Sequence, residues 1–172
     1  MVRRASATRC GIVVIVILLT LLGAVPAHAE PAFGTYRWPV RGPVIRGFER
    51  PESPYGSGHR GIDIAVAVGT PILAPAPGVV AFAGKIGSSL YVSVDHPDGV
   101  RTTFSWLSSV LVRKGDRVSA ADTLGTSGEG HAGADIPHLH LGARFGGDYI
   151  DPVPLFEPLD LVGLVHLAPL GG

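Results

Sequence analysis

Two histidines that lie two positions apart, His138 and His140, are the residues of this sequence best placed to do chemistry. The alternation of histidine and leucine from Pro137 to Leu141 predicts a β-strand, in which side chains two apart share a face. Both imidazoles then point one way, and Leu139 and Leu141 point into apolar packing. Such a motif fits a metal ligand beside an acid–base residue, but taken alone it is more often a pair of structural histidines.

A second pair, His59 and Asp63, lies far upstream in the chain. A spacing of four residues would place the two side chains on one face of a helix. Gly61 and the alternation of Ile62 and Ile64 indicate instead a loop that leads into a strand. Asp63 then points away from the two isoleucines, and the curved loop brings His59 beside it.

The side chains of His59, Asp63 and His140 together form a donor set that suits zinc. Catalytic zinc sites use three protein ligands, with nitrogen and oxygen among the donors, and leave a fourth position to water. Bound zinc lowers the pKa of that water to about 7 and polarises a carbonyl group. His138, on the same strand face as His140, is placed to take a proton from the water or to stabilise an oxyanion.

The elements that must position these residues are short. Apolar runs separated by glycine and proline turns, one of them expected at 84–87, predict strands at residues 38–40, 44–48, 70–74, 78–83, 89–95, 100–107, 123–126 and 137–141. Residues 143–152 read as a last hairpin, and a final strand is expected at 164–167. No helical period is sustained beyond the first 29 residues, so the fold class is all-β, a sandwich or a curled sheet.

The first 29 of the 172 residues resemble a secretory signal peptide. Arg3, Arg4 and Arg9 precede an apolar run, and Ala27 and Ala29 supply small residues at a cleavage site. An uncleaved membrane anchor is the alternative, although the run is short for a span of about 20 residues. We therefore expect a secreted or cell-envelope protein with no membrane segment after cleavage.

Charge and cysteine content exclude several kinds of partner and site. The chain has 14 basic and 14 acidic residues, so losing the three arginines of the leader leaves a net charge of −3. Nucleic-acid binding usually needs a basic surface, so no nucleic-acid partner is expected. The one cysteine, Cys10, lies in the leader, which excludes disulfides and thiolate metal sites from the mature chain. The sequence does not indicate an oligomeric state.

The two motifs resemble those of the lysostaphin/LytM-type zinc metallopeptidases, exported enzymes that cut peptide cross-links in peptidoglycan. Residues 58–63 resemble the H-x(3)-D motif and residues 137–140 the H-x-H motif, and collinear segments extend the resemblance over about residues 38–155. It implies a largely antiparallel, curled β-sheet with one Zn²⁺ in a groove, held by the histidines and aspartate of the two motifs. The domain would cover residues 37–157, after a leading segment at 30–36 and before a tail at 158–172.

The resemblance also implies that His138 is catalytic, and it exposes one departure. A further catalytic histidine is usual in the family, and Trp106 stands at its place. An indole N–H donates a hydrogen bond but cannot shuttle a proton. His131, in a glycine-rich loop, and Tyr55 are weaker candidates for the substrate groove, since both also read as solvated loop residues.

Two functions therefore remain open. The first is an exported zinc endopeptidase that hydrolyses peptide bonds of peptidoglycan cross-links or stem peptides. The second is a zinc-containing but catalytically weak domain that binds cell wall or activates another hydrolase. Trp106 favours the second, and the complete ligand set with His138 favours the first.

Overall fold

The computed structural model describes residues 30–53 and 56–156 of the chain, and within them it is all-β, which confirms the predicted fold class. The expected leader, Tyr55 and the expected strand at 164–167 lie outside the described residues. The elements are β1 Val44–Arg46, β2 Ile62–Ala65, β3 Pro71–Leu73, β4 Gly78–Ile86, β5 Ser89–Asp95, β6 Val100–Val110, β7 Arg117–Val118, β8 Thr123–Ser127, β9 His138–Phe145, β10 Asp148–Ile150 and one 3-10 turn, η1 Val153–Leu155.

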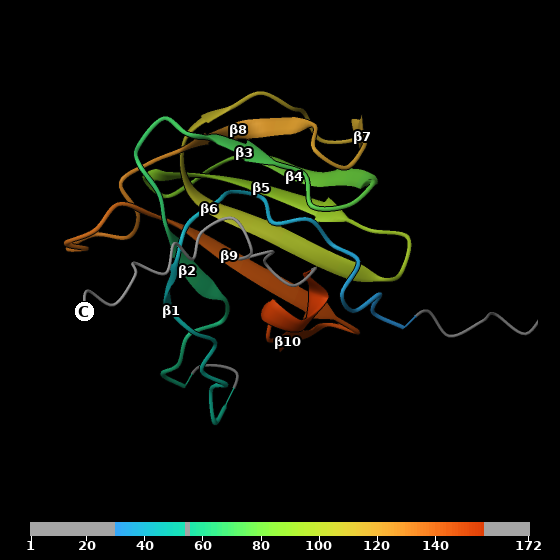
Figure 1. The fold of residues 1–172 in the computed structure, drawn as a ribbon, viewed down its shortest axis with the longest axis horizontal. Coiled ribbons are helices and arrows are strands. Elements are labelled where there is room, and N and C mark those ends of the chain that lie inside the picture. Colours follow the sequence, from blue (N-terminus) through green and yellow to red (C-terminus); the bar gives the residue numbers. More distant parts are fainter. Residues whose placement is uncertain (1–29, 54–55, 157–172) are drawn as a thin grey trace, which may run out of the picture.

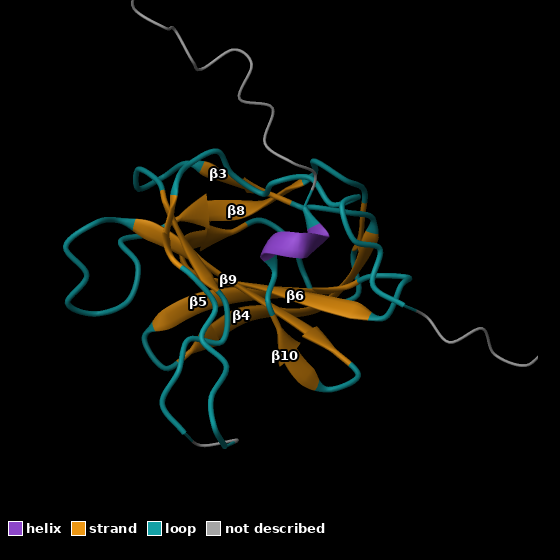
Figure 2. Ribbon diagram, turned by 60° about the horizontal axis from the view of Figure 1, so that its bottom comes forward, coloured by secondary structure: helices purple, strands orange, loops and turns teal. Residues whose placement is uncertain are grey.

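The strands form a single antiparallel sheet in the order β1-β2-β9-β6-β5-β4-β7, with β10 paired to β9 and β8 joining β6 to β3. The long strands β6 and β9 run side by side through its middle (Figure 1). Seen from another side, β3 and β8 lie above the layer of β4, β5, β6 and β9 (Figure 2). The sheet therefore curls over on itself, as the family resemblance implied. No helix in the described ranges is long and apolar enough to cross a membrane.

The hairpins end where the sequence supplies turn formers. In the β5–β6 turn, the backbone amide of His96 donates a hydrogen bond of 2.8 Å to the carbonyl oxygen of Val100, and Gly99 adopts a φ of 84°. The β4–β5 turn differs from the prediction, because β4 continues to Ile86 and pairs with Ser89. Only Gly87, with a φ of 61°, and its neighbour make that turn.

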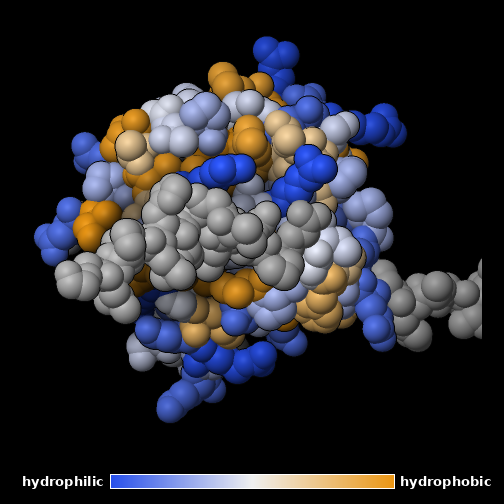
Figure 3. All heavy atoms as spheres, viewed as in Figure 1, coloured by the Kyte–Doolittle hydropathy of each residue, from blue (hydrophilic) through white to orange (hydrophobic). Residues whose placement is uncertain are grey.

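The core gathers side chains from strands in every part of the sheet. Ile62, Ile64, Leu139 and Leu141 of β2 and β9, with Phe104 of β6, are all fully buried. Burying a side chain of this size contributes about 1.5–3 kcal/mol to folding. On the face seen in Figure 3, hydrophilic side chains rim the molecule, and hydrophobic ones remain exposed in small patches. Scattered exposed apolar residues are normal for a soluble domain.

The N-terminal segment packs onto this core. Tyr36 is 2% exposed, and its hydroxyl donates to the Asp98 carboxylate at 3.1 Å. Trp38 stacks on Phe156 with ring centroids 4.5 Å apart. The two ends of the described chain therefore meet, and the segment before β1 is held against the sheet.

Candidate metal centre and groove

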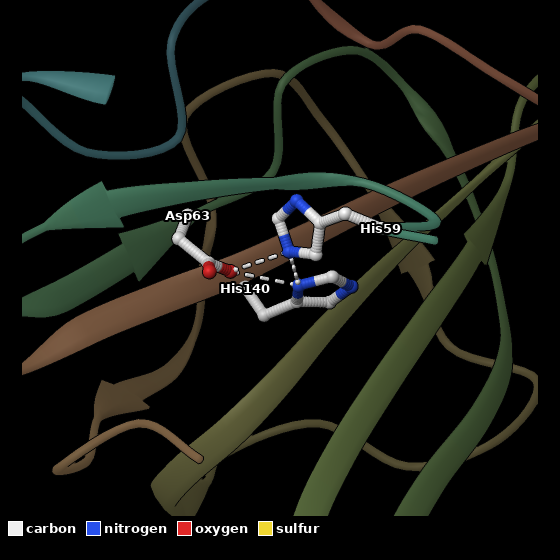
Figure 4. A group of neighbouring side chains, drawn as sticks. All are labelled: His59, Asp63 and His140. Carbon is white, nitrogen blue, oxygen red and sulfur yellow. Dashed lines mark hydrogen bonds and ion pairs between the residues drawn. The ribbon is translucent and has the colours of Figure 1, made fainter. Parts of the chain in front are cut away.

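Three side chains from separate parts of the sequence converge at one point (Figure 4). His59 Nε2 lies 3.1 Å from Asp63 Oδ1, and His140 Nδ1 lies 2.8 Å from the same oxygen. The two ring nitrogens are 3.1 Å apart. These are the three residues that the sequence predicted as metal ligands, and the structure brings their donor atoms together.

Strand register places two of them. In the β2–β9 pair, Asp63 is the direct cross-strand partner of His140, and Ala65 is the partner of His138. The neighbouring pairs, Ile62 with Leu141 and Ile64 with Leu139, point to the core. The alternation that buries four apolar side chains thus turns the carboxylate and both imidazoles to the opposite face.

His59 reaches the centre from the loop before β2. Its backbone makes a bridge with Glu49, through hydrogen bonds of 2.9 and 2.8 Å. Its ring Nδ1 lies 2.7 Å from the carbonyl oxygen of Gly47, so Nδ1–H donates and the lone pair of Nε2 faces Asp63. A second hydrogen bond of this kind orients metal-binding histidines in general.

Asp63 is ionised in this environment. Burial acts to raise the pKa of Asp63, but the hydrogen bond with His140 and the electrostatic effect of His59 outweigh it. The pKa of this carboxyl therefore lies below its usual range. When a cation takes the place of the ring protons, the ionised oxygen and the two imidazole nitrogens become three electron donors around it.

The donor set fits a zinc ion. Ligand atoms of a tetrahedral zinc site, with bonds of about 2.0–2.2 Å, lie about 3.3 Å from one another. The three separations here are 3.1, 2.8 and 3.1 Å, so a small outward shift opens the space for the ion. Two nitrogens and one oxygen also match the ligand types that zinc takes in sites with an open position.

His138 stands beside the centre and is 2% exposed. Its Nδ1 donates to the carbonyl oxygen of Ile136 at 2.8 Å, which leaves Nε2 as the acceptor. Nε2 lies 3.9 Å from Asp63 Oδ1 and accepts a long hydrogen bond of 3.5 Å from the backbone amide of His131. An imidazole with its basic nitrogen turned toward the ligands has the geometry of a general base.

A groove of about 480 Å³ opens over the centre. Its lining includes His59 and His140, together with Trp106 and His131, both of which the sequence suggested. Tyr55, the third suggested groove residue, lies outside the described part of the chain. The ring centroids of Trp106 and Tyr91 are 6.1 Å apart. The backbone φ of Trp106 is +64°, which is unusual for a bulky residue.

Sequence reasoning missed Arg60 and Tyr149, which line the same groove. The Arg60 guanidinium lies 5.9 Å from the centroid of the Tyr149 ring. Tyr149 stands on β10, which reaches the groove through its pairing with β9. The one signal in the sequence was that Arg60 directly follows a predicted ligand.

Comparison with known proteins adds a family and relatives. Residues 57–152 match the family described as peptidase family M23. An uncharacterized protein of Mycobacterium tuberculosis is 36% identical over 151 residues, 84% of this chain and 59% of that protein. The murein hydrolase activator NlpD of Escherichia coli is 32% identical over 121 residues, 69% of this chain and 30% of that protein. The match thus spans less than two thirds of the length of either relative.

Solved structures of similar fold include two peptidases. The catalytic domain of the antimicrobial peptidase lysostaphin from Staphylococcus simulans is 28% identical, with a TM-score of 0.54 over 63% of this chain and 86% of that one. A zinc-containing peptidase from Vibrio cholerae is 26% identical, with a TM-score of 0.60 over 72% of this chain and 40% of that one.

Proposed function

Since the chain belongs to peptidase family M23, as its two motifs predicted, we propose that it is an exported zinc metalloendopeptidase. Its substrates would be peptide bonds in the cross-links or stem peptides of peptidoglycan. The observation that carries the proposal is the convergence of three donor atoms within 3.1 Å, with His138 beside them. A fold kept only for binding has no need of this arrangement.

In this proposal each residue of the centre has one role. His59, Asp63 and His140 hold the ion, and the carbonyl of Gly47 fixes the ring of His59 through its Nδ1–H. Zinc supplies Lewis-acid activation of water and of the scissile carbonyl. His138 Nε2 accepts the proton of the attacking water and passes it to the leaving nitrogen. Because the carbonyl of Ile136 holds Nδ1–H, the basic nitrogen of His138 stays turned toward the reaction.

The relatives support a cell-wall substrate and also a second candidate function. One is named a murein hydrolase activator and another an antimicrobial peptidase, so both roles occur among similar proteins. Trp106, at the groove position where the family resemblance implies a histidine, favours a chain that activates another hydrolase. The ionised Asp63 and the oriented His138 favour hydrolysis, and we place hydrolysis first.

Domain limits and location follow from the same proposal. Residues 1–29 would be the signal peptide, residues 37–157 the peptidase domain and residues 158–172 a tail. Tyr36 and Trp38 pack onto the core, so the leading segment would fold with the domain. Peptidoglycan lies outside the cytoplasmic membrane, which agrees with an exported chain acting in the cell envelope.

A digest of purified peptidoglycan tests the proposal. The chain from Glu30 to Gly172, loaded with zinc, should release fragments with new peptide ends, which mass spectrometry identifies together with the bond cut. His140→Ala should bind no zinc and release nothing. His138→Ala should keep its zinc and lose at least about 10²-fold in rate, the usual contribution of a general base.

The two functions predict different outcomes for that digest. Absence of new ends from a chain with stoichiometric zinc would remove the endopeptidase proposal for this substrate. An activator would then bind the wall equally well with or without the His138→Ala change. The amount of protein that sediments with insoluble peptidoglycan measures this.

A further inference from the structure

The loop between β8 and β9, residues 128–137, is held against the groove by two glycines near its start. The amide of Gly128 donates to the carbonyl oxygen of Trp106 at 2.9 Å, and a Cβ at this glycine would lie 2.4 Å from that oxygen. Gly130 has a φ of +94°, and a Cβ there would lie 2.3 Å from the ring of His138. Only glycine lets the backbone approach Trp106 and His138 this closely.

This close approach carries the next residue, His131, into the groove. The ring of His131 lies 4.7 Å from the ring of His138 between centroids, at an angle of 63°. A short turn, in which the amide of Ala134 donates to the His131 carbonyl at 3.1 Å, closes the loop behind it. His131 is partly exposed and lines the groove together with His59 and His140.

The side chain of His131 reaches the place where a substrate carbonyl would react. One of its ring nitrogens lies within 4.8 Å of a carboxylate oxygen of Asp63 and of a ring nitrogen of His138. At this separation the ring nitrogen of His131 is within hydrogen-bond reach of an oxygen atom that stands over the centre. Nδ1 of His131 also lies 3.3 Å from the carbonyl oxygen of Ala132, a long contact, so the one N–H of a neutral ring is shared between that carbonyl and the groove, whereas imidazolium has an N–H for each.

We propose that His131 is a catalytic residue that donates a hydrogen bond to the developing oxyanion, the role that Trp106 leaves open on β6. The inference rests on the proposed peptidase function. Water attacks the carbonyl carbon as His138 takes its proton, a C–O bond forms, and the carbonyl π pair moves onto the oxygen that His131 binds. The pair then returns, the C–N bond breaks, and the proton on His138 goes to the leaving nitrogen.

The test combines a rate with a binding measurement that needs no turnover. Inorganic phosphate, a tetrahedral oxyanion, is titrated calorimetrically into zinc-loaded protein, and peptidoglycan digestion is followed in parallel. His131→Ala should weaken phosphate binding about tenfold, as expected for loss of one hydrogen bond to a charged group. It should slow digestion about 10²–10³-fold, with unchanged zinc content.

Two variants control for the loop. His131→Gln keeps an N–H donor on the side chain and should retain most of the phosphate affinity. Glu129→Ala changes an exposed residue of the same loop and removes a negative charge, so it should not weaken phosphate binding. Zinc content and circular dichroism of each variant establish that the centre and the sheet are intact.

The outcomes separate this inference from the peptidase proposal. If His131→Ala digests peptidoglycan and binds phosphate as the unaltered chain does, His131 is not the donor, although the peptidase function stands. If no variant digests peptidoglycan but phosphate affinity still falls with His131→Ala, the donor role stands and the substrate proposal fails. A loss of affinity equal in Glu129→Ala would assign the effect to the loop and overturn the role of His131.

Discussion

At the scale of single residues, two side chains of the groove decide which hydrogen-bond donors it offers. The β8–β9 loop supplies the imidazole of His131, and β6 supplies the indole of Trp106. Trp106 adopts a left-handed backbone conformation, with a φ of +64°. Bulky residues rarely adopt this conformation, and histidine does so more readily. Position 106 therefore accepts a histidine without backbone change, while keeping its place in the groove next to Tyr91.

This argument predicts a rescue. In a chain that carries His131→Ala, the further change Trp106→His should raise the digestion rate about tenfold or more above that of His131→Ala alone. The reason is that it returns an N–H donor to the groove. Trp106→Phe in the same background is the control, since phenylalanine keeps an aromatic ring without the donor. Equal rates for the two double variants would mean that position 106 lies out of reach of the reacting carbonyl.

At the scale of elements, the metal centre depends on the register of β2 against β9. A slip of one residue would turn His140 to the core side and place a leucine opposite Asp63. Gly61, just before β2, helps to fix this register by its lack of a side chain. A Cβ at position 61 would lie 2.3 Å from the carbonyl oxygen of Leu141 and 2.9 Å from His140 Nε2.

We expect Gly61→Ala to weaken zinc binding by about tenfold or more, because the new methyl group must displace His140 or the backbone of β9. Competition with a chromophoric chelator measures the affinity. Gly47→Ala is the matched control, since a Cβ there meets nothing within 4 Å and the carbonyl that accepts from His59 remains. Unchanged affinity in Gly61→Ala would show that the strand pair moves apart without cost to the centre.

At the scale of the whole molecule, a buried histidine outside the candidate metal centre ties the hairpin β5–β6 to the rest of the sheet. His96 is 5% exposed, with its Nδ1 2.9 Å from the carbonyl oxygen of Pro77 and its Nε2 2.9 Å from the hydroxyl of Thr102. Its ring also packs edge-on to Tyr36, at 4.9 Å between centroids. This residue therefore joins the N-terminal segment, the start of β4 and β6.

His96 should make stability depend on pH. Burial lowers the pKa of His96 below its usual 6.5, and the Pro77 carbonyl, Asp98 and Asp95 oppose this only in part. The unfolded chain then binds the proton more readily, so the free energy of unfolding should fall as pH drops from about 6.5 toward the lowered value. Urea unfolding at pH 7.5, 6.5 and 5.5 measures it. In His96→Gln the slope should be shallower, and an unchanged slope would assign it to other groups.

Sequence alone predicted the fold class, most strands and the three residues whose donor atoms meet. These predictions depend on the local alternation of apolar and polar residues, as in Ile62–Ala65 and His138–Leu141. They also depend on short motifs that can be recognised from residue types and spacing alone. The extension of β4 to Ile86 was not predictable, because it depends on pairing with Ser89 across a two-residue turn. Nor could spacing place Tyr149, since a neighbouring strand brings it to the groove. His131 was suggested as a groove residue, but its close approach to His138 depends on the contact of Gly130 with that ring.

Strands β2 and β9 keep their apolar residues and their reactive residues on opposite faces. Substitution of Asp63 or His140 therefore removes chemistry and leaves every core side chain in place. In evolutionary terms, a descendant of this chain can lose the converging donor set in a single step and keep its shape. The groove would persist as a surface on which selection for binding can act.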